Sequence, residues 1–216
     1  LLLSAFVICL AGTSIAQESP LWMRHCALSP DGTTIAFTYK GDIYTVPSTG
    51  GRATQITTNP AFDTEPVWGP DSKQIAFASD RMGSLDVFVV SSEGGAPQRL
   101  TTHSGSEKPV AYKDNKHILF TANIAPSAED AGFPSGQFQQ VYEVAVTGGR
   151  PAMFSSMPME CISINKEGVM LYQDKKGYED YWRKHQVSPI ARDIWTYTPG
   201  KKPVYQKQTT FGGEDR

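Results

Sequence analysis

The chain repeats one arrangement of turns and apolar runs four times, and this repetition limits its possible folds more than any other feature. In the first copy, the turn Ser29-Pro30-Asp31-Gly32 precedes the apolar run Ile35-Ala36-Phe37, and Gly50-Gly51 and Thr57-Thr58 follow. The same order returns at Pro70-Asp71, 75–77, Gly94-Gly95 and Thr101-Thr102, then at Asp114, 118–120, Gly148-Gly149 and Ser155-Ser156, and last at Glu167, 170–172, Gly200 and Thr209-Thr210. The chain is therefore an array of one structural unit.

Each copy predicts four short strands. A Pro-Asp-Gly sequence makes a tight turn, because proline fixes φ, aspartate accepts hydrogen bonds from the following backbone, and glycine takes a positive φ. The apolar run predicts a buried strand, and the Gly-Gly pair predicts the next hairpin. These pairs begin at 50, 94 and 148, so the unit repeats after 44 and then 54 residues. Four antiparallel strands at this spacing are typical of a propeller blade, whereas a Greek-key sandwich would not bring the same turn back in phase.

We therefore predict an all-β chain that forms a β-propeller, with four blades of four antiparallel strands at about 24–58, 66–102, 109–156 and 161–211. The residues after Thr210 resemble the inter-blade links 59–65 and 103–108. They indicate the start of a fifth blade, and we expect the chain to be a fragment of a protein with six or more blades. An open array exposes unpaired blade faces, so we also expect the fragment to be marginally stable and prone to aggregation.

The first residues of the chain predict a targeting segment. Residues 1–16 (LLLSAFVICLAGTSIA) carry no charge and are mostly apolar. The run is short for a membrane span and ends in small residues before Gln17, which is typical of a secretory signal peptide without its initiator methionine. A membrane anchor is the alternative. We expect residues 17–216 to be exported to the periplasm or the cell exterior, without membrane contact after cleavage.

Composition excludes two classes of protein. Hydrophobic residues make up 39% of the 216 residues and charged residues 19%, and the formal net charge is −2. A disordered tail would contain fewer apolar residues and more charge. A nucleic-acid-binding domain that works through a basic field would be far more positive, so we expect no nucleic-acid partner.

Two links between the second and third strands of a unit are long, at about 123–138 in the third copy and 174–192 in the fourth. In an antiparallel blade both project from the same face, where long loops often bind partners. The second insertion mixes aromatic residues with charges, so it is a candidate peptide or partner contact formed by Tyr178, Tyr181, Trp182, Arg183 and His185. The alternative is a folded loop held by its own aromatic residues.

The residues predict no catalytic, cofactor-binding or metal-binding site. The histidines form no H-E-x-x-H pair, and the sequence Gly132-Phe133-Pro134-Ser135-Gly136 places serine one position too late for a nucleophile elbow. His103 and Glu107 have a spacing that could suit a metal, but we interpret them as part of a solvated inter-blade loop. Cys26 and Cys161 are interpreted as two small buried hydrophobic residues rather than as a disulfide.

Several stretches of the sequence resemble a known family. Pro20-Leu21-Trp22-Met23-Arg24 precedes the first unit, and Tyr172-Gln173-Asp174-Lys175-Lys176-Gly177-Tyr178-Glu179-Asp180 runs on to Trp182-Arg183-Lys184-His185 in the fourth. The units are similar to the Pro-Asp propeller repeats shared by TolB-like proteins and Tricorn-type proteases. The fourth unit most resembles the N-terminal propeller of bacterial exported Tricorn protease homologues, and the resemblance covers 20–216. The turns Lys113-Asp114 and Lys166-Glu167 depart from it, because they lack the proline.

This resemblance implies a non-catalytic region of a tail-specific serine peptidase, whose PDZ-like and protease domains would follow in a longer protein. The family's catalytic residues correspond to no position in this chain. The implied role is to gate or guide a peptide or unfolded protein to the protease domain of the same chain, and to help build a homo-oligomer. One alternative is a complete TolB-like periplasmic scaffold that binds protein partners. Another is the propeller of a prolyl-oligopeptidase-type enzyme.

Overall fold

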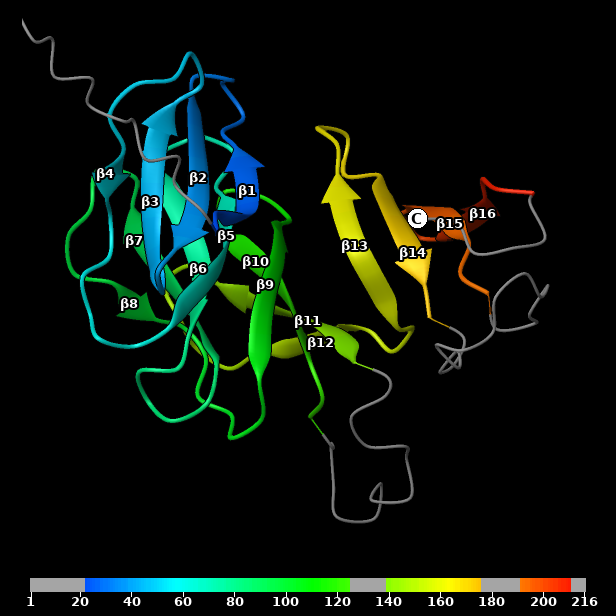
Figure 1. Ribbon diagram of the computed structural model, residues 1–216. Coiled ribbons are helices and arrows are strands. Elements are labelled where there is room, and N and C mark those ends of the chain that lie inside the picture. Colours follow the sequence, from blue (N-terminus) through cyan, green and yellow to red (C-terminus); the bar gives the residue numbers. More distant parts are fainter. Residues whose placement is uncertain (1–21, 125–138, 176–190, 211–216) are drawn as a thin grey trace, which may run out of the picture.

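The computed structural model describes residues 22–124, 139–175 and 191–210, and this part of the chain consists of strands joined by turns and links. The strands form four sheets of four antiparallel strands each. Consecutive sheets lie next to one another, and β1, β5, β9 and β13 are turned toward the middle of the array (Figure 1). The propeller predicted from the repeats is therefore confirmed, with one blade for each copy.

The blades follow the order of the sequence copies. Blade one contains β1 (Arg24–Leu28), β2 (Thr34–Tyr39), β3 (Asp42–Pro47) and β4 (Thr54–Gln55). Blade two contains β5 (Asp63–Trp68), β6 (Gln74–Ser79), β7 (Asp86–Ser91) and β8 (Gln98–Arg99). Blade three contains β9 (Glu107–Tyr112), β10 (His117–Ala122), β11 (Gln140–Ala145) and β12 (Ala152–Ser155). Blade four contains β13 (Met159–Ile164), β14 (Met170–Asp174), β15 (Ile194–Thr198) and β16 (Val204–Lys207).

The repeated turn residues form the turns that their chemistry predicts. In blade one, Gly32 has a φ of 75° and its N–H donates to the Ser29 carbonyl at 2.8 Å. The Asp31 carboxylate accepts from the Thr33 N–H at 3.0 Å. Both glycines of the Gly50-Gly51 pair have positive φ values, 86° and 127°, as the hairpin between β3 and β4 requires.

The threonines that end each unit close the outer edge of the blade. The Thr57 hydroxyl accepts a hydrogen bond from the Ile43 N–H at 3.0 Å, directly after the short strand β4. The same contact returns in two other blades, from the Val87 N–H to Thr101 at 2.9 Å and from the Ile194 N–H to Thr209 at 3.2 Å. A side chain thus extends the ladder by one hydrogen bond where the backbone strand has ended.

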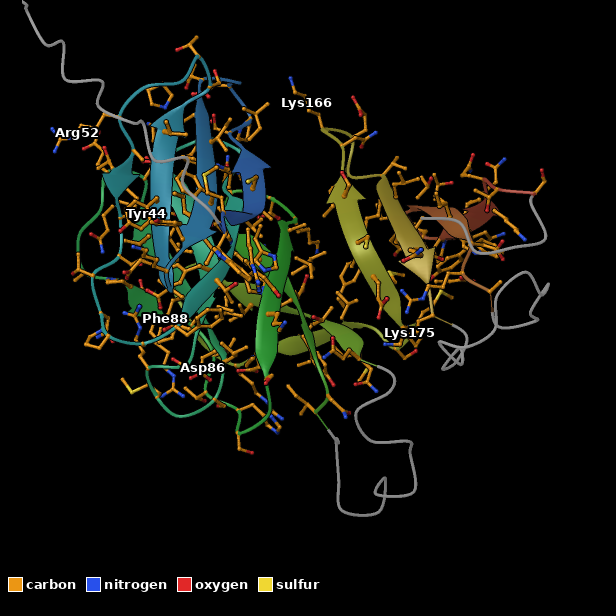
Figure 2. The ribbon with its side chains drawn as sticks, viewed as in Figure 1. Tyr44, Arg52, Asp86, Phe88, Lys166 and Lys175 are labelled. Atoms are coloured by element: carbon orange, nitrogen blue, oxygen red, sulfur yellow. The ribbon has the colours of Figure 1, made fainter. Side chains whose placement is uncertain are left out.

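Each of the first three blades packs an aliphatic face against an aromatic face of the next blade. Ala36 and Ile43 of blade one lie in one buried cluster with Phe77 and Phe88 of blade two, whose rings stack at 5.9 Å. The next interface repeats this arrangement with Ala76 and Val87 against Phe120 and Tyr142. Figure 2 shows Phe88 inside the array, whereas Arg52 extends from its outer side. The core is therefore divided among the blade interfaces.

The first strands of three blades begin earlier than the sequence indicates. They start at Asp63, Glu107 and Met159, where we predicted starts near 66, 109 and 161. For two of these strands the reason is chemical: Asp63 and Glu107 are fully buried acidic residues, whereas a carboxylate between two strands is typical of a solvated link. Asp63 instead binds Arg81, and Glu107 lies beside Asp86, both at junctions between blades.

Candidate functional site: the axial groove

A groove runs along the middle of the array, between the first strands of all four blades. Each of these strands is the edge of its sheet and has one hydrogen-bonded neighbour, so its other edge faces the axis. The groove has a volume of about 830 Å³. Its wall comes from β1, β5, β9 and β13 and the turns that follow them: Cys26, Ala27, Leu28, Pro30, Pro66, Val67, Trp68, Pro70, Val110, Ala111, Tyr112, 113–115, Ile162, Ser163, Ile164 and 165–166.

The strand part of this wall is mostly apolar. Leu28 lines the groove with 59% of its surface exposed, and Cys26 of the same strand is also exposed there. Trp68 lies behind the wall, nearly buried, and its indole N–H donates to the Ala27 carbonyl of blade one at 3.0 Å. This hydrogen bond fixes the spacing of the first two blades at the groove. An apolar concave wall with few polar groups is typical of a ligand-binding cleft.

Bulges interrupt the strands that form the groove. His25, Glu65 and Cys161 occupy the same position in β1, β5 and β13, and their φ values are 51°, 55° and 52°. Each lies where the register to the second strand shifts. In β9 the register shifts next to Pro109, which has no N–H. Such bulges and prolines prevent an exposed edge from pairing freely with other strands.

Charged side chains lie near the starts of the inner strands, beyond the residues that line the groove. Lys108 of blade three binds Glu65 of blade two, with Nζ 2.7 Å from Oε1. In blade four, Glu160 contacts Lys175 at 2.8 Å and Arg192 at 2.9 Å. We call these five residues the charged mouth. Lys166, which lines the turn end of the groove together with Lys113 and Asp114, and Lys175 of the charged mouth lie at opposite ends of blade four (Figure 2).

The charged mouth lies on the face of the predicted insertions. Glu107, which precedes Lys108, pairs with Ala122 at the end of β10, and Glu160 pairs with Gln173 near the end of β14. The segments 125–138 and 176–190 follow these strand ends in the chain. The predicted contact residues Tyr178, Tyr181, Trp182, Arg183 and His185 lie outside the described residues.

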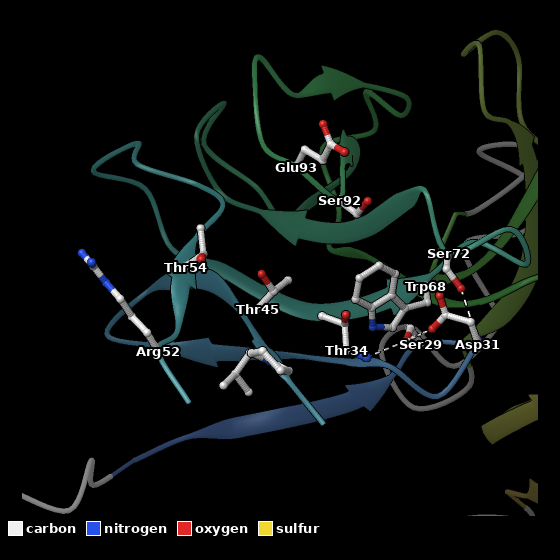
Figure 3. Close-up of a pocket in the computed structure, with 12 residues that line it drawn as sticks. Ser29, Asp31, Thr34, Thr45, Arg52, Thr54, Trp68, Ser72, Ser92 and Glu93 are labelled. Atoms are coloured by element: carbon white, nitrogen blue, oxygen red, sulfur yellow. Dashed lines mark hydrogen bonds between the residues drawn. The ribbon is translucent and has the colours of Figure 1, made fainter. Parts of the chain in front are cut away.

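A second, smaller pocket of about 340 Å³ lies between blades one and two at the turn end (Figure 3). Hydroxyl groups dominate its lining, and Arg52 and Glu93 stand at its border. The Asp31 N–H donates to the Ser72 hydroxyl at 3.3 Å, which links the two Pro-Asp turns. The Ser29 hydroxyl and the Thr33 N–H and hydroxyl donate to Asp31 and lower the pKa of its carboxyl to about 2. These contacts join adjacent turns, so we regard the pocket as part of the blade junction.

Two interpretations from the sequence are wrong. Cys26 and Cys161 are not buried: both are exposed free thiols, because each lies on an inner strand that has a hydrogen-bonded neighbour on one edge only. Glu107 is not part of a solvated loop. It begins β9 with no exposed surface, and its carboxylate accepts a hydrogen bond from the His103 N–H at 3.3 Å.

Two further features bear on the chemistry of the site. Within 22–124, 139–175 and 191–210, no three His, Cys, Asp or Glu side chains come together as a metal ion would require. The same described ranges include no helix long and apolar enough to cross a membrane.

The groove residues were not recognised from the sequence. They come from four segments that are distant in the chain, and only the closure of the array brings them together. One signal was present, because the lining residues occupy the same positions just before each Pro-Asp turn or its equivalent. Those positions have the pattern of ordinary buried strands. Nothing in a single repeat shows which strand has an edge without a hydrogen-bonded partner.

The fold and groove define a non-helical propeller domain built from Pro-Asp repeats. The chain belongs to the family of the Tricorn protease N-terminal beta propeller domain, whose profile matches residues 20–216. It is 38% identical over 77 residues to Tricorn protease homolog 1 of Streptomyces coelicolor, which covers 36% of this chain and 7% of that protein. It is 31% identical over 108 residues to the uncharacterized peptidase YuxL of Bacillus subtilis, covering 44% of this chain and 16% of that one. The chain therefore spans a small part of these relatives.

Solved structures share the fold at low sequence identity. The tricorn protease crystal structure superposes on 91% of this chain and 19% of that chain, with a TM-score of 0.66 and 16% identity. A putative TolB from Agrobacterium tumefaciens matches 88% of this chain and 69% of that chain, with a TM-score of 0.59 and 20% identity. These similarities support the propeller architecture.

Proposed function

We propose that this propeller guides a peptide or unfolded protein toward the protease domain of an exported Tricorn-like serine peptidase, and that the axial groove is the part that holds the substrate. The observation that carries the proposal is the groove itself: four inner strands line it, their part of its wall is largely apolar, and the ion-paired charged mouth lies near the starts of these strands. An extended polypeptide can enter such a groove, whereas a folded domain is too wide for it. In this proposal the chain supplies no catalytic residue, and it contributes to a homo-oligomer and acts outside the cytoplasm.

The exposed thiol of Cys26 offers a direct test, because it lines the groove. In the intact protein, with its other cysteines replaced by serine, Cys26 is alkylated with a bulky maleimide. We expect degradation of a permanently unfolded, fluorescein-labelled protein to slow several-fold, because the adduct fills the groove. Degradation of a two-residue chromogenic peptide that can reach the protease domain directly should change little.

A matched control uses the same reagent on the outer strand of blade four. Val204→Cys, in a protein without other cysteines, places a thiol on β16 at a position that is 56% exposed and away from the groove. Its alkylation should leave both activities unchanged. Equal rates for the Cys26 adduct and the unmodified protein would refute the groove as the substrate path.

The second candidate is a TolB-like scaffold that binds a protein partner and guides no substrate. The extent of the match to the TolB chain, 69% of its length, is the observation that favours it. In that case the intact protein degrades no unfolded substrate, and the Cys26 adduct weakens binding of a folded partner instead. Activity measurements on the unmodified protein therefore separate the two candidates.

A further inference from the structure

Two acidic side chains meet at the junction of blades two and three without access to solvent. Asp86 is the first residue of β7, and Glu107 is the first residue of β9. Both have 0% of their surface exposed. The Glu107 N–H donates to the carbonyl of Leu85, next to Asp86, at 2.7 Å, which holds the two strand starts together. Figure 2 shows Asp86 inside the array, toward the end with the charged mouth.

Among the residues that the structure describes, one cation faces these two carboxyls. Arg99 of β8 approaches Asp86 with Nη2 2.8 Å from Oδ2, and the Arg99 side chain is 30% exposed. The His103 N–H donates to Oε2 of Glu107, and the Thr101 hydroxyl also contacts this carboxyl. Among the described residues, Oδ1 of Asp86 and Oε1 of Glu107 have no hydrogen-bond donor. Two ionised carboxylates would leave one uncompensated buried charge, which is far more costly than a shared proton.

The other junctions of this chain show that the two acids occur together. The corresponding pair between blades one and two is Asp42 and Asp63, and there Arg81 binds Asp63 through both carboxylate oxygens at 2.9 Å. Between blades three and four, both positions lack an acid, because the strands begin with Gln140 and Met159. Each junction therefore has both acids or neither. This is the pattern expected when the second carboxyl holds the proton that the first carboxylate accepts as a hydrogen bond.

We propose that Asp86 and Glu107 form a proton-binding site that holds one proton at neutral pH, with the Glu107 carboxylic acid donating to the Asp86 carboxylate. Burial raises the pKa of both carboxyls. Arg99 contacts Asp86, which favours the ionised form of that carboxyl and leaves the proton on Glu107. In the described part of the chain, the charged groups that act on the pair are Arg99 and the two carboxyls themselves, and the titratable residue beside it is His103, whose N–H contacts Glu107.

Loss of this proton should loosen the junction. The closed form binds one proton more than an opened form in which both carboxyls reach water, so the closed junction is most favoured below the ordinary carboxyl pKa. That advantage is lost as pH rises through the raised pKa of the pair. A one-proton linkage changes the opening equilibrium by at most about tenfold per pH unit. The site therefore makes this junction, near the starts of the inner strands, sensitive to rising pH.

Hydrogen exchange of the intact protein measures this opening. We expect the amides of Glu107 and Val87 to lose protection by up to about tenfold per pH unit as pH rises from the ordinary carboxyl pKa toward the raised pKa of the pair, after correction for intrinsic exchange. Glu107→Gln should abolish this dependence, because a neutral amide still donates to Asp86. Glu143→Gln, at a solvent-accessible glutamate paired with Lys113, should keep it. Equal pH dependence in the two variants would overturn the proposal.

Infrared difference spectroscopy detects the proton itself. The spectrum of the wild-type protein minus that of Glu107→Gln, in heavy water at neutral pH, should contain the carbonyl band of a protonated carboxylic acid. The band should be missing when wild type is compared with Glu143→Gln. Absence of the band in the first comparison, or protection that depends on sodium concentration instead of pH, would show that the pair is ionised and would refute the shared proton.

Discussion

The ion pair between Arg81 and Asp63 allows the energetic importance of a blade junction to be measured. Asp63 has no exposed surface, and Arg81 is 11% exposed. The guanidinium contacts both carboxylate oxygens at 2.9 Å and lies 4.5 Å from the centre of the Phe88 ring. Arg81→Met keeps most of the side-chain volume but removes the charge. The Asp63 carboxylate then stays buried without its cation.

The structure sets the expected magnitude. Removing one partner of a buried ion pair costs about 3–5 kcal/mol, because the remaining charge is neither solvated nor paired. The lost cation–π contact adds about 1 kcal/mol. In an Asp63→Asn background the buried charge is absent, so Arg81→Met should cost much less there. We expect a coupling free energy of at least about 2 kcal/mol between the two positions.

The assay is equilibrium unfolding in urea, followed by tryptophan fluorescence, for the wild type, both single variants and the double variant. The surface pair Lys113–Glu143 serves as the matched cycle. Its distance is shorter, 2.6 Å, but its side chains are 39% and 27% exposed. Solvent screening should limit that coupling to about 0.2–1 kcal/mol. A coupling at Lys113–Glu143 as large as that at Arg81–Asp63 would refute the argument that burial, rather than distance, determines the energy.

Three further outcomes follow from single contacts. Leu171 is 45% exposed on blade four, so Leu171→Lys should lower self-association, measured by sedimentation, without lowering stability. The same change at Leu119, which is fully buried, should prevent folding. Trp68→Phe loses the hydrogen bond to the Ala27 carbonyl and should cost about 1–3 kcal/mol in urea unfolding. The lowered pKa of Asp31 means that its contribution to stability is present above the ordinary carboxyl pKa and is lost as pH falls through about 2, which carboxyl NMR titration can follow.

Most of the fold could be predicted because the repeated residues act locally. A Pro-Asp-Gly turn or a Gly-Gly hairpin depends on the φ preferences of its own residues, so it has the same meaning in every copy. The terminal threonines also recur, but their role could not be predicted. Thr57 bonds to the N–H of Ile43, fourteen positions earlier, and that contact exists only after the blade has formed.

The errors fall on the inner strands, where the usual patterns do not apply. A strand with one hydrogen-bonded neighbour and a free edge on the axis need not alternate between apolar and polar residues. Cys161 shows the consequence, because it lies in a left-handed bulge with its thiol exposed. Glu107 shows the opposite error, since its charge suggested solvent although it is fully buried at a blade junction. Both environments are produced by neighbouring blades.

The open side of blade four shows how directly the blade interfaces follow from the repeat. Leu171 occupies the position of Ala36, Ala76 and Leu119, each of which has no exposed surface because the aromatic face of the next blade covers it. The residue at this position is apolar in blade four, as it is in the other three blades. Its exposure shows that no blade of the described residues packs on this face, and a surface that covers it in the same way would resemble the Phe77–Phe88 face in shape and polarity. A blade with that face would complete the fourth interface by the rule that builds the first three.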